Sequence, residues 1–239
     1  MSFVPKIKMD CQNCPIRHRA VCARCEGEEL ESLNAIKFYK AVEAGQTIAM
    51  EGDELKIVAS VVSGTASLSR TLEDGRTQIL GLLLPSDFMG RPGRSTVAHD
   101  VTALTDMTLC CFHRKPFEQL MYRAPHISER LMEMALDELD ASRDWMLLLG
   151  RKTAREKIAS MLMFVLRRTR TPGQDENDNH NITLPIGREQ MANYLGLTIE
   201  TVSRQLSKLK ADGLIELDGN RGVVIPDVQA LQAETGDAA

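Results

Sequence analysis

Residues 187–198 read Gly187-Arg188-Glu189-Gln190-Met191-Ala192-Asn193-Tyr194-Leu195-Gly196-Leu197-Thr198, and this stretch decides the fold of the C-terminal part of the chain. Met191, Ala192 and Leu195 recur at helical spacing and predict one apolar helix face. Gly196 can take the left-handed backbone conformation that a tight turn requires, and Thr198 is a good N-cap for a second helix. The pattern predicts a helix-turn-helix.

The second helix of the motif is expected to run from Ile199 to about Asp212 and to stop at Gly213. Apolar residues at every third or fourth position predict its core face: Ile199, Val202, Leu206 and Leu209. Two short strands are expected to follow, at residues 214–217 and 222–225. The whole is then a winged helix.

The outward side of this second helix carries the side chains that read base edges in a major groove. Arginine bridges guanine O6 and N7, glutamate accepts from cytosine N4, and serine or threonine contacts thymine. The candidate DNA-binding residues are Glu200, Thr201, Ser203, Arg204 and Lys208. Within this set Lys208 is a candidate for a phosphate contact, and so are Lys210, Arg221 and the basic residues within 151–170. The alternative is a solvated helix face with a Glu200–Arg204 ion pair, and the helix-turn-helix context favours DNA.

Composition and charge limit the classes of protein. The chain has 239 residues, a formal net charge of −4, 26% charged residues and 43% hydrophobic residues, which is typical of a globular protein. Its longest apolar run, Met161 to Leu166, is far shorter than the roughly 20 residues of a membrane helix. The N-terminus lacks the apolar core of a signal peptide. We therefore expect a cytoplasmic protein with no membrane partner.

Residues 42–112 have a different texture, with glycine-containing turns between short apolar runs. Turn signals about every 8–12 residues predict an antiparallel barrel or jelly roll. We therefore expect an α+β fold with four segments: residues 1–27 (cysteine-rich), 28–124 (β-barrel), 125–150 (long dimerisation helix) and 151–239 (winged helix-turn-helix).

The long helix carries a stripe of mostly apolar residues at alternating spacings of three and four, which is a heptad seam. The seam consists of Met132, Ala135, Leu139, Ser142, Met146 and Leu149. It predicts a homodimer, which the hydroxyl of Ser142 would weaken. The alternative is that the stripe packs on the chain's own barrel. Four further apolar residues are expected to cover the barrel instead: Leu131, Leu136, Leu147 and Leu148.

Four cysteines lie close together as Cys11-x-x-Cys14 and Cys22-x-x-Cys25, and two more are adjacent at Cys110-Cys111. Three interpretations stay open. A zinc site on the four N-terminal cysteines has the right ligand count, but its pairs are closer together than the usual 15–20 or so residues. An iron–sulfur cluster prefers several close cysteines plus a remote one. Reduced, buried thiols are the third interpretation.

Two local expectations follow from the cysteine positions. In an alternating strand Cys110 and Cys111 point to opposite faces, so only one of them can join a shared site. The basic residues between Arg17 and Arg24 are expected to lower the pKa of the nearby thiols.

Together these features resemble the CRP/FNR family of bacterial regulators, over nearly the whole length and with the reading motif Glu200-Thr201-Val202-Ser203-Arg204. The motif Cys11-x-x-Cys14-x7-Cys22 with remote Cys110 looks like the oxygen-sensing FNR branch in its alphaproteobacterial members. The resemblance implies a cyclic-nucleotide-binding-like jelly roll and a [4Fe-4S] cluster on Cys11, Cys14, Cys22 and Cys110.

The resemblance also implies a mechanism. Without oxygen, an intact cluster favours a homodimer that binds double-stranded DNA at inverted repeats of the TTGAT…ATCAA type. Oxygen converts the cluster to a [2Fe-2S] form and DNA is released. Activators of this group contact RNA polymerase through exposed barrel loops, for which the 73–76 hairpin is a candidate.

Rival functions are distinguished by particular residues. A cyclic-nucleotide sensor needs a Gly-Glu pair for the ribose, where this chain has Gly90-Arg91, and only Arg94 resembles the phosphate-binding residue. A zinc-stabilised, oxygen-indifferent DNA-binding protein is a second rival. A ferredoxin-like electron carrier is disfavoured by the winged helix, and we find no nucleophile–base pattern of an enzyme.

Overall fold

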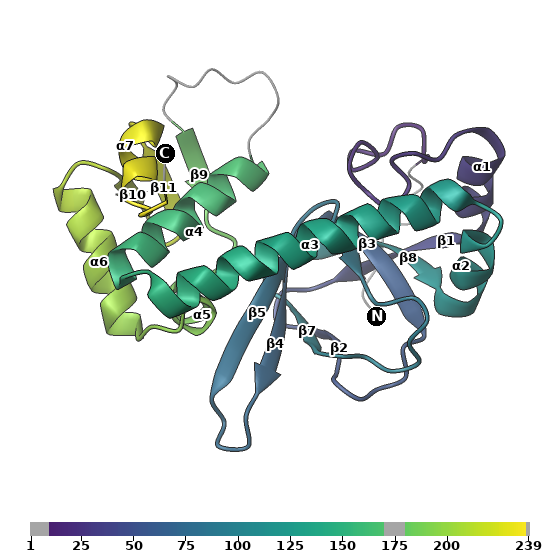
Figure 1. Ribbon diagram of the computed structural model, residues 1–239, viewed down its shortest axis with the longest axis horizontal. Helices are drawn as coiled ribbons and strands as arrows, with labels where there is room; N and C mark the ends of the chain where they lie inside the picture. The colour runs from purple at the N-terminus through teal and green to yellow at the C-terminus, as the bar shows by residue number, and fades with distance from the viewer. Residues whose placement is uncertain (1–9, 170–179, 238–239) are drawn as a thin grey trace. The chain divides into compact units, whose positions relative to one another are not determined.

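The computed structural model describes residues 10–169 and 180–237 (Figure 1). Residues 1–9 of the predicted cysteine-rich segment lie outside the described residues. The chain forms two compact units, Met1–Asp140 and Ala141–Ala239, and helix α3 (Pro125–Arg151) contributes to both. No helix in the described ranges is both long and apolar enough to cross a membrane.

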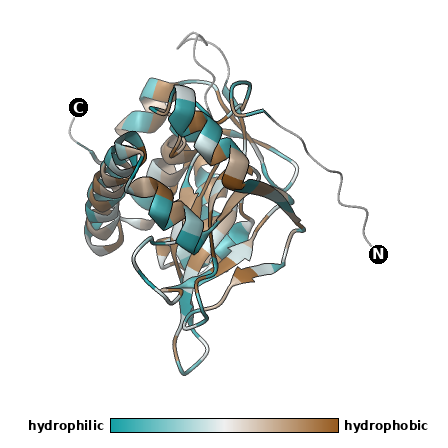
Figure 2. Ribbon diagram, turned by 90° about the vertical axis from the view of Figure 1, so that its right-hand side faces the viewer, coloured by the Kyte–Doolittle hydropathy of each residue, from teal (hydrophilic) through white to brown (hydrophobic). Residues whose placement is uncertain are grey.

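The first unit contains two four-stranded antiparallel sheets that form the predicted jelly-roll sandwich. One sheet has the order β1-β8-β3-β6 and the other β2-β7-β4-β5. The strands are β1 (Lys37–Val42), β2 (Thr47–Ala49), β3 (Ile57–Ser63), β4 (Ala66–Thr71), β5 (Thr77–Leu83), β6 (Phe88–Met89), β7 (Asp100–Ala103) and β8 (Met107–His113). Hydrophobic residues on these strands, brown in Figure 2, supply its core.

Strand β8 contributes to two different cores because its side chains alternate between the faces of its sheet. Leu109 and Cys111 join the core formed by residues of both sheets. Cys110 and Phe112 point the other way, into a second core that includes residues of the N-terminal segment. The expectation that Cys110 and Cys111 face opposite sides is confirmed.

The second core joins the N-terminal segment to three helices of the first unit. These are α1 (Gly27–Ile36), α2 (Arg114–Met121) and the beginning of α3. Phe117 of α2 and Ile127 of α3 are fully buried in it, and Leu131 packs against it as predicted. The N-terminal segment is therefore part of the fold of the first unit.

The second unit has the predicted winged helix-turn-helix. Its elements are α4 (Ala154–Thr169), β9 (His180–Thr183), α5 (Arg188–Leu195), α6 (Ile199–Ala211), β10 (Glu216–Asp218), β11 (Gly222–Ile225) and α7 (Val228–Ala233). The wing is a three-stranded antiparallel sheet in the order β10-β11-β9, and β9 was not predicted. Ile158, Leu195 and Leu209 are among its fully buried side chains.

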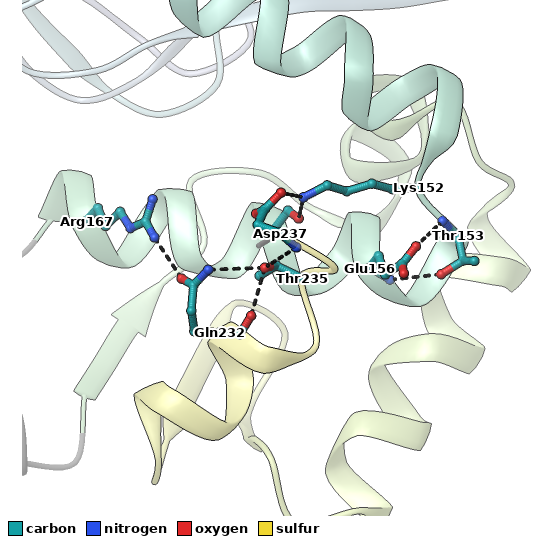
Figure 3. Close-up of polar contacts among 8 residues, drawn as sticks. Lys152, Thr153, Glu156, Arg167, Gln232, Thr235 and Asp237 are labelled. Carbon is teal, nitrogen blue, oxygen red and sulfur yellow. Dashed lines mark hydrogen bonds and ion pairs between the residues drawn. The ribbon is translucent and has the colours of Figure 1, made fainter. Parts of the chain in front are cut away.

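Polar contacts tie the end of the chain to the connection between α3 and α4 (Figure 3). Lys152 Nζ donates to Ser160 Oγ at 2.8 Å and pairs with Asp237 Oδ1 at 2.5 Å. Arg167 Nη2 donates to Gln232 Oε1 at 2.7 Å. These contacts lie within the second unit and fix α7 and residues 234–237 on α4.

Candidate nucleic-acid interface and cysteine centre

The helix-turn-helix is built by local rules. Gly196, with φ 62° and ψ 43°, makes the left-handed turn between α5 and α6. The Thr198 hydroxyl accepts from Thr201 N at 3.2 Å and caps α6. Lys157 of α4, a buried side chain, donates to the carbonyl of Leu195 at 3.2 Å, where the α5 dipole is negative.

The core face of α6 is narrower than predicted. Val202, Leu206 and Leu209 are buried, as expected from their spacing. Ile199 is 45% exposed, so its assignment to the core face was wrong. It is the first residue of the helix, before the helix reaches the core of its unit.

The predicted DNA-reading residues gather at the N-terminal end of α6. Glu200 and Arg204 are exposed, and Thr201 and Ser203 are half-buried. Hydrogen bonds from its own backbone amide and from Thr198 hold the pKa of the Glu200 carboxyl below its ordinary value. Glu200 is thus ionised and acceptor-only at neutral pH. Among the described residues no ion pair joins Glu200 to Arg204. The alternative interpretation, a solvated helix face with this ion pair, is therefore not supported.

Arg188 also belongs to this surface, and the sequence did not predict it. It is the first residue of α5, and its Nη1 donates to Ser203 Oγ at 3.3 Å. Arg204 Nη2 donates to Thr201 Oγ1 at 3.4 Å. Two guanidinium groups therefore flank the α6 N-terminus, which suits an anionic ligand. A basic residue at the start of the first helix was the available signal.

Several basic residues within 151–170 already have partners inside the second unit, which corrects their assignment to phosphate contacts. Lys152 pairs with Asp237, and Lys157 is buried. Arg155 bridges Glu234 at 2.5 Å and Asp212 at 2.7 Å. Lys208 and Lys210 stay exposed on α6.

The cysteine centre is assembled from the N-terminal segment and β8. Cys11 and Cys110 are buried in the second core, and Cys14 and Cys22 pack against it. Cys11, Cys22 and Cys14 each raise the pKa of Cys110 by electrostatic repulsion. Burial raises the pKa of Cys111 to about 11, Lys40 opposes this, and none of the N-terminal cysteines contributes. The four predicted ligands therefore share one core, which also contains Cys25, and Cys111 lies in the other core.

Burial decides the pKa values of these thiols. Burial first, and then repulsion from Cys11, raises the pKa of Cys110 to about 12. Burial and the charges of Cys14 and Cys11 raise the pKa of Cys22, against the smaller opposing effect of Arg17. The expectation that nearby basic residues lower these pKa values was wrong because desolvation outweighs them. Four mutually repelling thiolates need a positive core to be stable together.

Three residues that the sequence reasoning missed support the centre. Lys37 Nζ donates to Cys11 Sγ at 3.1 Å. Tyr39, opposite Cys110 in the β1–β8 pairing, hydrogen-bonds with that thiol. Arg17 donates to the carbonyls of Cys22 and Cys25, both at 2.6 Å, and so closes the loop between the cysteines. Strand alternation places Lys37 and Tyr39 on one face and was the available signal.

The donor set consists of thiols, which can ligate a cluster as well as a single zinc ion. In the described part of the chain, no three His, Cys, Asp or Glu side chains are arranged to hold one metal ion. A zinc ion would need all its sulfur ligands about 2.3 Å from one point. A cluster binds each thiolate to a different iron, so its ligands stand further apart. Cys25 is fully buried next to Glu29, and its pKa is raised to about 12, chiefly by burial.

The predicted seam residues of α3 are exposed in the single chain. Met132 is 68% exposed and Met146 is 73% exposed. Ala135, Leu139 and Ser142 are exposed too, and Leu149 is half-buried. The stripe therefore does not pack on the chain's own barrel. Leu136 and Leu147, each 55% exposed, do not cover the barrel as expected, and they widen the apolar face.

The loop that corresponds to a cyclic-nucleotide cassette has an acidic partner. Glu118 Oε1 accepts from Gly93 N at 2.9 Å and pairs with Arg114 at the same distance. Arg91 and Arg94 are exposed on this loop. The Gly93 amide is thus occupied by a carboxylate, which repels a phosphate.

Comparisons with known proteins agree with this architecture. Residues 155–234 match the Crp-like helix-turn-helix domain family, and residues 39–124 match the cyclic nucleotide-binding domain family. The chain is 59% identical to the transcriptional activator protein FnrL of Cereibacter sphaeroides, over 98% of this chain and 95% of that protein. It is 30% identical to the fumarate and nitrate reduction regulatory protein of Salmonella typhi, over 95% and 90%.

A solved structure, that of FixK2 from Bradyrhizobium japonicum, has a TM-score of 0.77 and 31% identity, covering 85% of this chain and 100% of that one. FnrL is a transcriptional activator, and the helix-turn-helix family matched here is Crp-like, so these similarities are to transcription regulators rather than to enzymes. The chain belongs to the Crp/FNR family and is a transcription regulator of its FNR branch.

Proposed function

We propose that this regulator responds to oxygen through a [4Fe-4S] cluster held by Cys11, Cys14, Cys22 and Cys110. The observation that supports the proposal is the gathering of these four thiols, together with Cys25, at one buried core, while Cys111 faces another. When bound, the cluster supplies reactivity toward oxygen, and its positive core offsets the repulsion between the thiolates.

The chain's own residues hold and shield this centre. The surrounding core excludes water from Cys11 and Cys110. Lys37 and Tyr39 direct polar hydrogens at ligand sulfurs, which stabilises their negative charge. Arg17 fixes the backbone on which Cys22 is carried. Loss of the cluster removes the bonds to sulfur that stabilise this arrangement of the cysteine segment.

The active form is proposed to be a homodimer paired through the exposed α3 seam, from Met132 to Leu149. A symmetric pair presents two α6 helices to half-sites one helical turn apart, so the operator is an inverted repeat of the TTGAT…ATCAA type. The β4–β5 hairpin, whose turn begins at the exposed Leu72, is the proposed contact for RNA polymerase.

Purification under argon, followed by iron, sulfide and zinc analysis and an operator-binding titration, tests the proposal. We expect iron and sulfide in equal amounts, no stoichiometric zinc, and an operator affinity that falls about 5–150-fold after exposure to air. A colourless protein containing one zinc and binding the operator equally in air and argon would contradict it. Tightening of operator binding by a cyclic nucleotide would favour the rival sensor.

A further inference from the structure

Two arginines tie the cysteine segment to α3. Arg24, between Cys22 and Cys25, forms an ion pair with Glu133 of α3. Arg130 donates from Nη1 to the same carboxylate at 3.1 Å and from Nη2 to the carbonyl of Arg19 at 2.8 Å. Glu133 therefore receives one guanidinium from the segment and one from its own helix, and the second also grips the segment's backbone.

Apolar packing continues the same connection. Ile16, Ala20 and Val21 of the segment share the second core with Ile127 of α3. The polar ties lie at the rim of this core, where the side chains of Arg130 and Glu133 are 20% and 36% exposed. A displacement of the cysteine segment would therefore act directly on α3 through the contacts of Arg24, Arg130 and Glu133.

The position of Glu133 along α3 gives this connection a role. It directly follows Met132, the first residue of the exposed seam. Glu133, whose side chain contacts the cysteine segment, is therefore adjacent to Met132, whose side chain belongs to the proposed dimer seam. Among the described residues, Glu129, one turn earlier, is exposed and has neither an ion pair nor a hydrogen bond.

We propose that Glu133 is a positioning residue that couples the cysteine centre to dimerisation, by holding Arg24 and Arg130 together. This inference rests on the proposed function. With the cluster bound, the ordered segment fixes α3 through Glu133 in the orientation that pairs. Without the cluster the segment no longer positions Arg24, and α3 loses that constraint. Because the pair is partly exposed, its effect is modest and weakens in salt.

The test compares full-length wild type with Glu133→Gln and the matched control Glu129→Gln, with and without reconstituted cluster. Sedimentation gives the dimer dissociation constant, iron and sulfide analysis gives the cluster content, and thermal unfolding gives stability. We expect the dissociation constant of cluster-loaded Glu133→Gln to rise about three- to tenfold. Its cluster content, its thermal unfolding and its cluster-free dimerisation should equal wild type, and Glu129→Gln should match wild type throughout.

Two additional measurements sharpen the outcome. Arg24→Gln combined with Glu133→Gln should lose no more than the larger single effect, because the two residues act as one pair. At about 1 M salt, where charges are screened within roughly 3 Å, the difference between wild type and Glu133→Gln should shrink.

Glu133→Gln that dimerises like wild type when loaded would overturn the inference, as would a variant that loses cluster or unfolds earlier. These outcomes leave the proposed function standing as long as wild type responds to its cluster. A wild type whose dimerisation ignores the cluster would instead overturn the proposed function, and this inference with it.

Discussion

The surface at the start of α6 and the cysteine centre differ in how completely the chain builds them. The predicted DNA-binding residues, Glu200 to Lys208, lie within nine positions on one capped helix, and three of the five are exposed. The cysteine centre draws on the N-terminal segment and on β8, is mostly buried, and raises the pKa values of its own thiols. The surface of α6 is complete when the second unit folds. The cysteine centre holds its sulfurs as thiolates only when a positively charged group is bound. The proposed regulation therefore acts through the cysteine centre, which requires a bound group to hold its thiolates together.

The sharpest way to break this comparison is to exchange the roles of Cys110 and Cys111. We expect Cys110→Ser to abolish cluster binding, since its sulfur lies with Cys11, and Cys111→Ser to retain the cluster. Iron and sulfide analysis under argon checks this. Both variants should still fold their second unit. Retention of the cluster by Cys110→Ser and its loss in Cys111→Ser would reverse the assignment.

A second test addresses the seam on α3. Leu139→Glu places a charge at an exposed seam position and should give a monomer even without oxygen. Its cluster content should be unchanged, because Leu139 is not part of the second core. Analytical ultracentrifugation measures the outcome. A stable dimer of this variant would show that the chains pair elsewhere.

The third test changes only the predicted DNA-binding surface of α6. Arg204→Ala should weaken binding to the inverted repeat by about 1–3 kcal/mol per half-site and relax the preference for guanine. Lys208→Ala is the control: a phosphate contact loses affinity about equally on all sequences. Competition titrations with half-site variants distinguish the two. A sequence-independent loss for Arg204→Ala would assign it to phosphate.

The smallest effect concerns His126, which lies on α3 next to Glu29 of α1. The hydrogen bond and charge of Glu29, at 2.8 Å, raise its pKa above 6.5, with a smaller contribution from Glu129 and opposition from Arg24 and desolvation. The folded protein favours the protonated ring, so this contact's contribution to stability is full below pH 6.5 and is lost as pH rises through the raised value.

NMR titration of the His126 ring measures this pKa directly. Glu29→Gln should lower it toward 6.5, and Glu129→Gln should lower it less. An unchanged pKa in Glu29→Gln would show that the contact does not persist in solution.

Sequence reasoning succeeded where structure is local. The turn at Gly196, the cap at Thr198 and the alternation of Cys110 and Cys111 depend on a few neighbouring residues, and the structure has all three. The β-sandwich followed from turn spacing, although strand order did not.

It failed where the answer depends on residues far away. Burial of Cys22 outweighs the charge of Arg17, and burial is a property of the whole fold. Strand alternation puts Lys37 and Tyr39 on one face, but Lys37 is 26 positions from Cys11, so the sequence does not show that this face meets the cysteine segment. Lys152 has its partner near the other end of the second unit, at Asp237, so its charge is not the free cation that its sequence neighbourhood suggested.

The alternation along β8 has a consequence for how this protein can vary. Leu109 and Cys111 fill the sandwich while Cys110 and Phe112 face the second core, so inserting or deleting one residue upstream in this strand would turn all of these side chains to the opposite face. A single deletion would place the bulky Phe112 where Cys111 stands in the sandwich, and the small Cys110 where Leu109 stands. Both cores would be mispacked at once, so the register that packs the sandwich also keeps the Cys110 thiol on the side of the N-terminal segment.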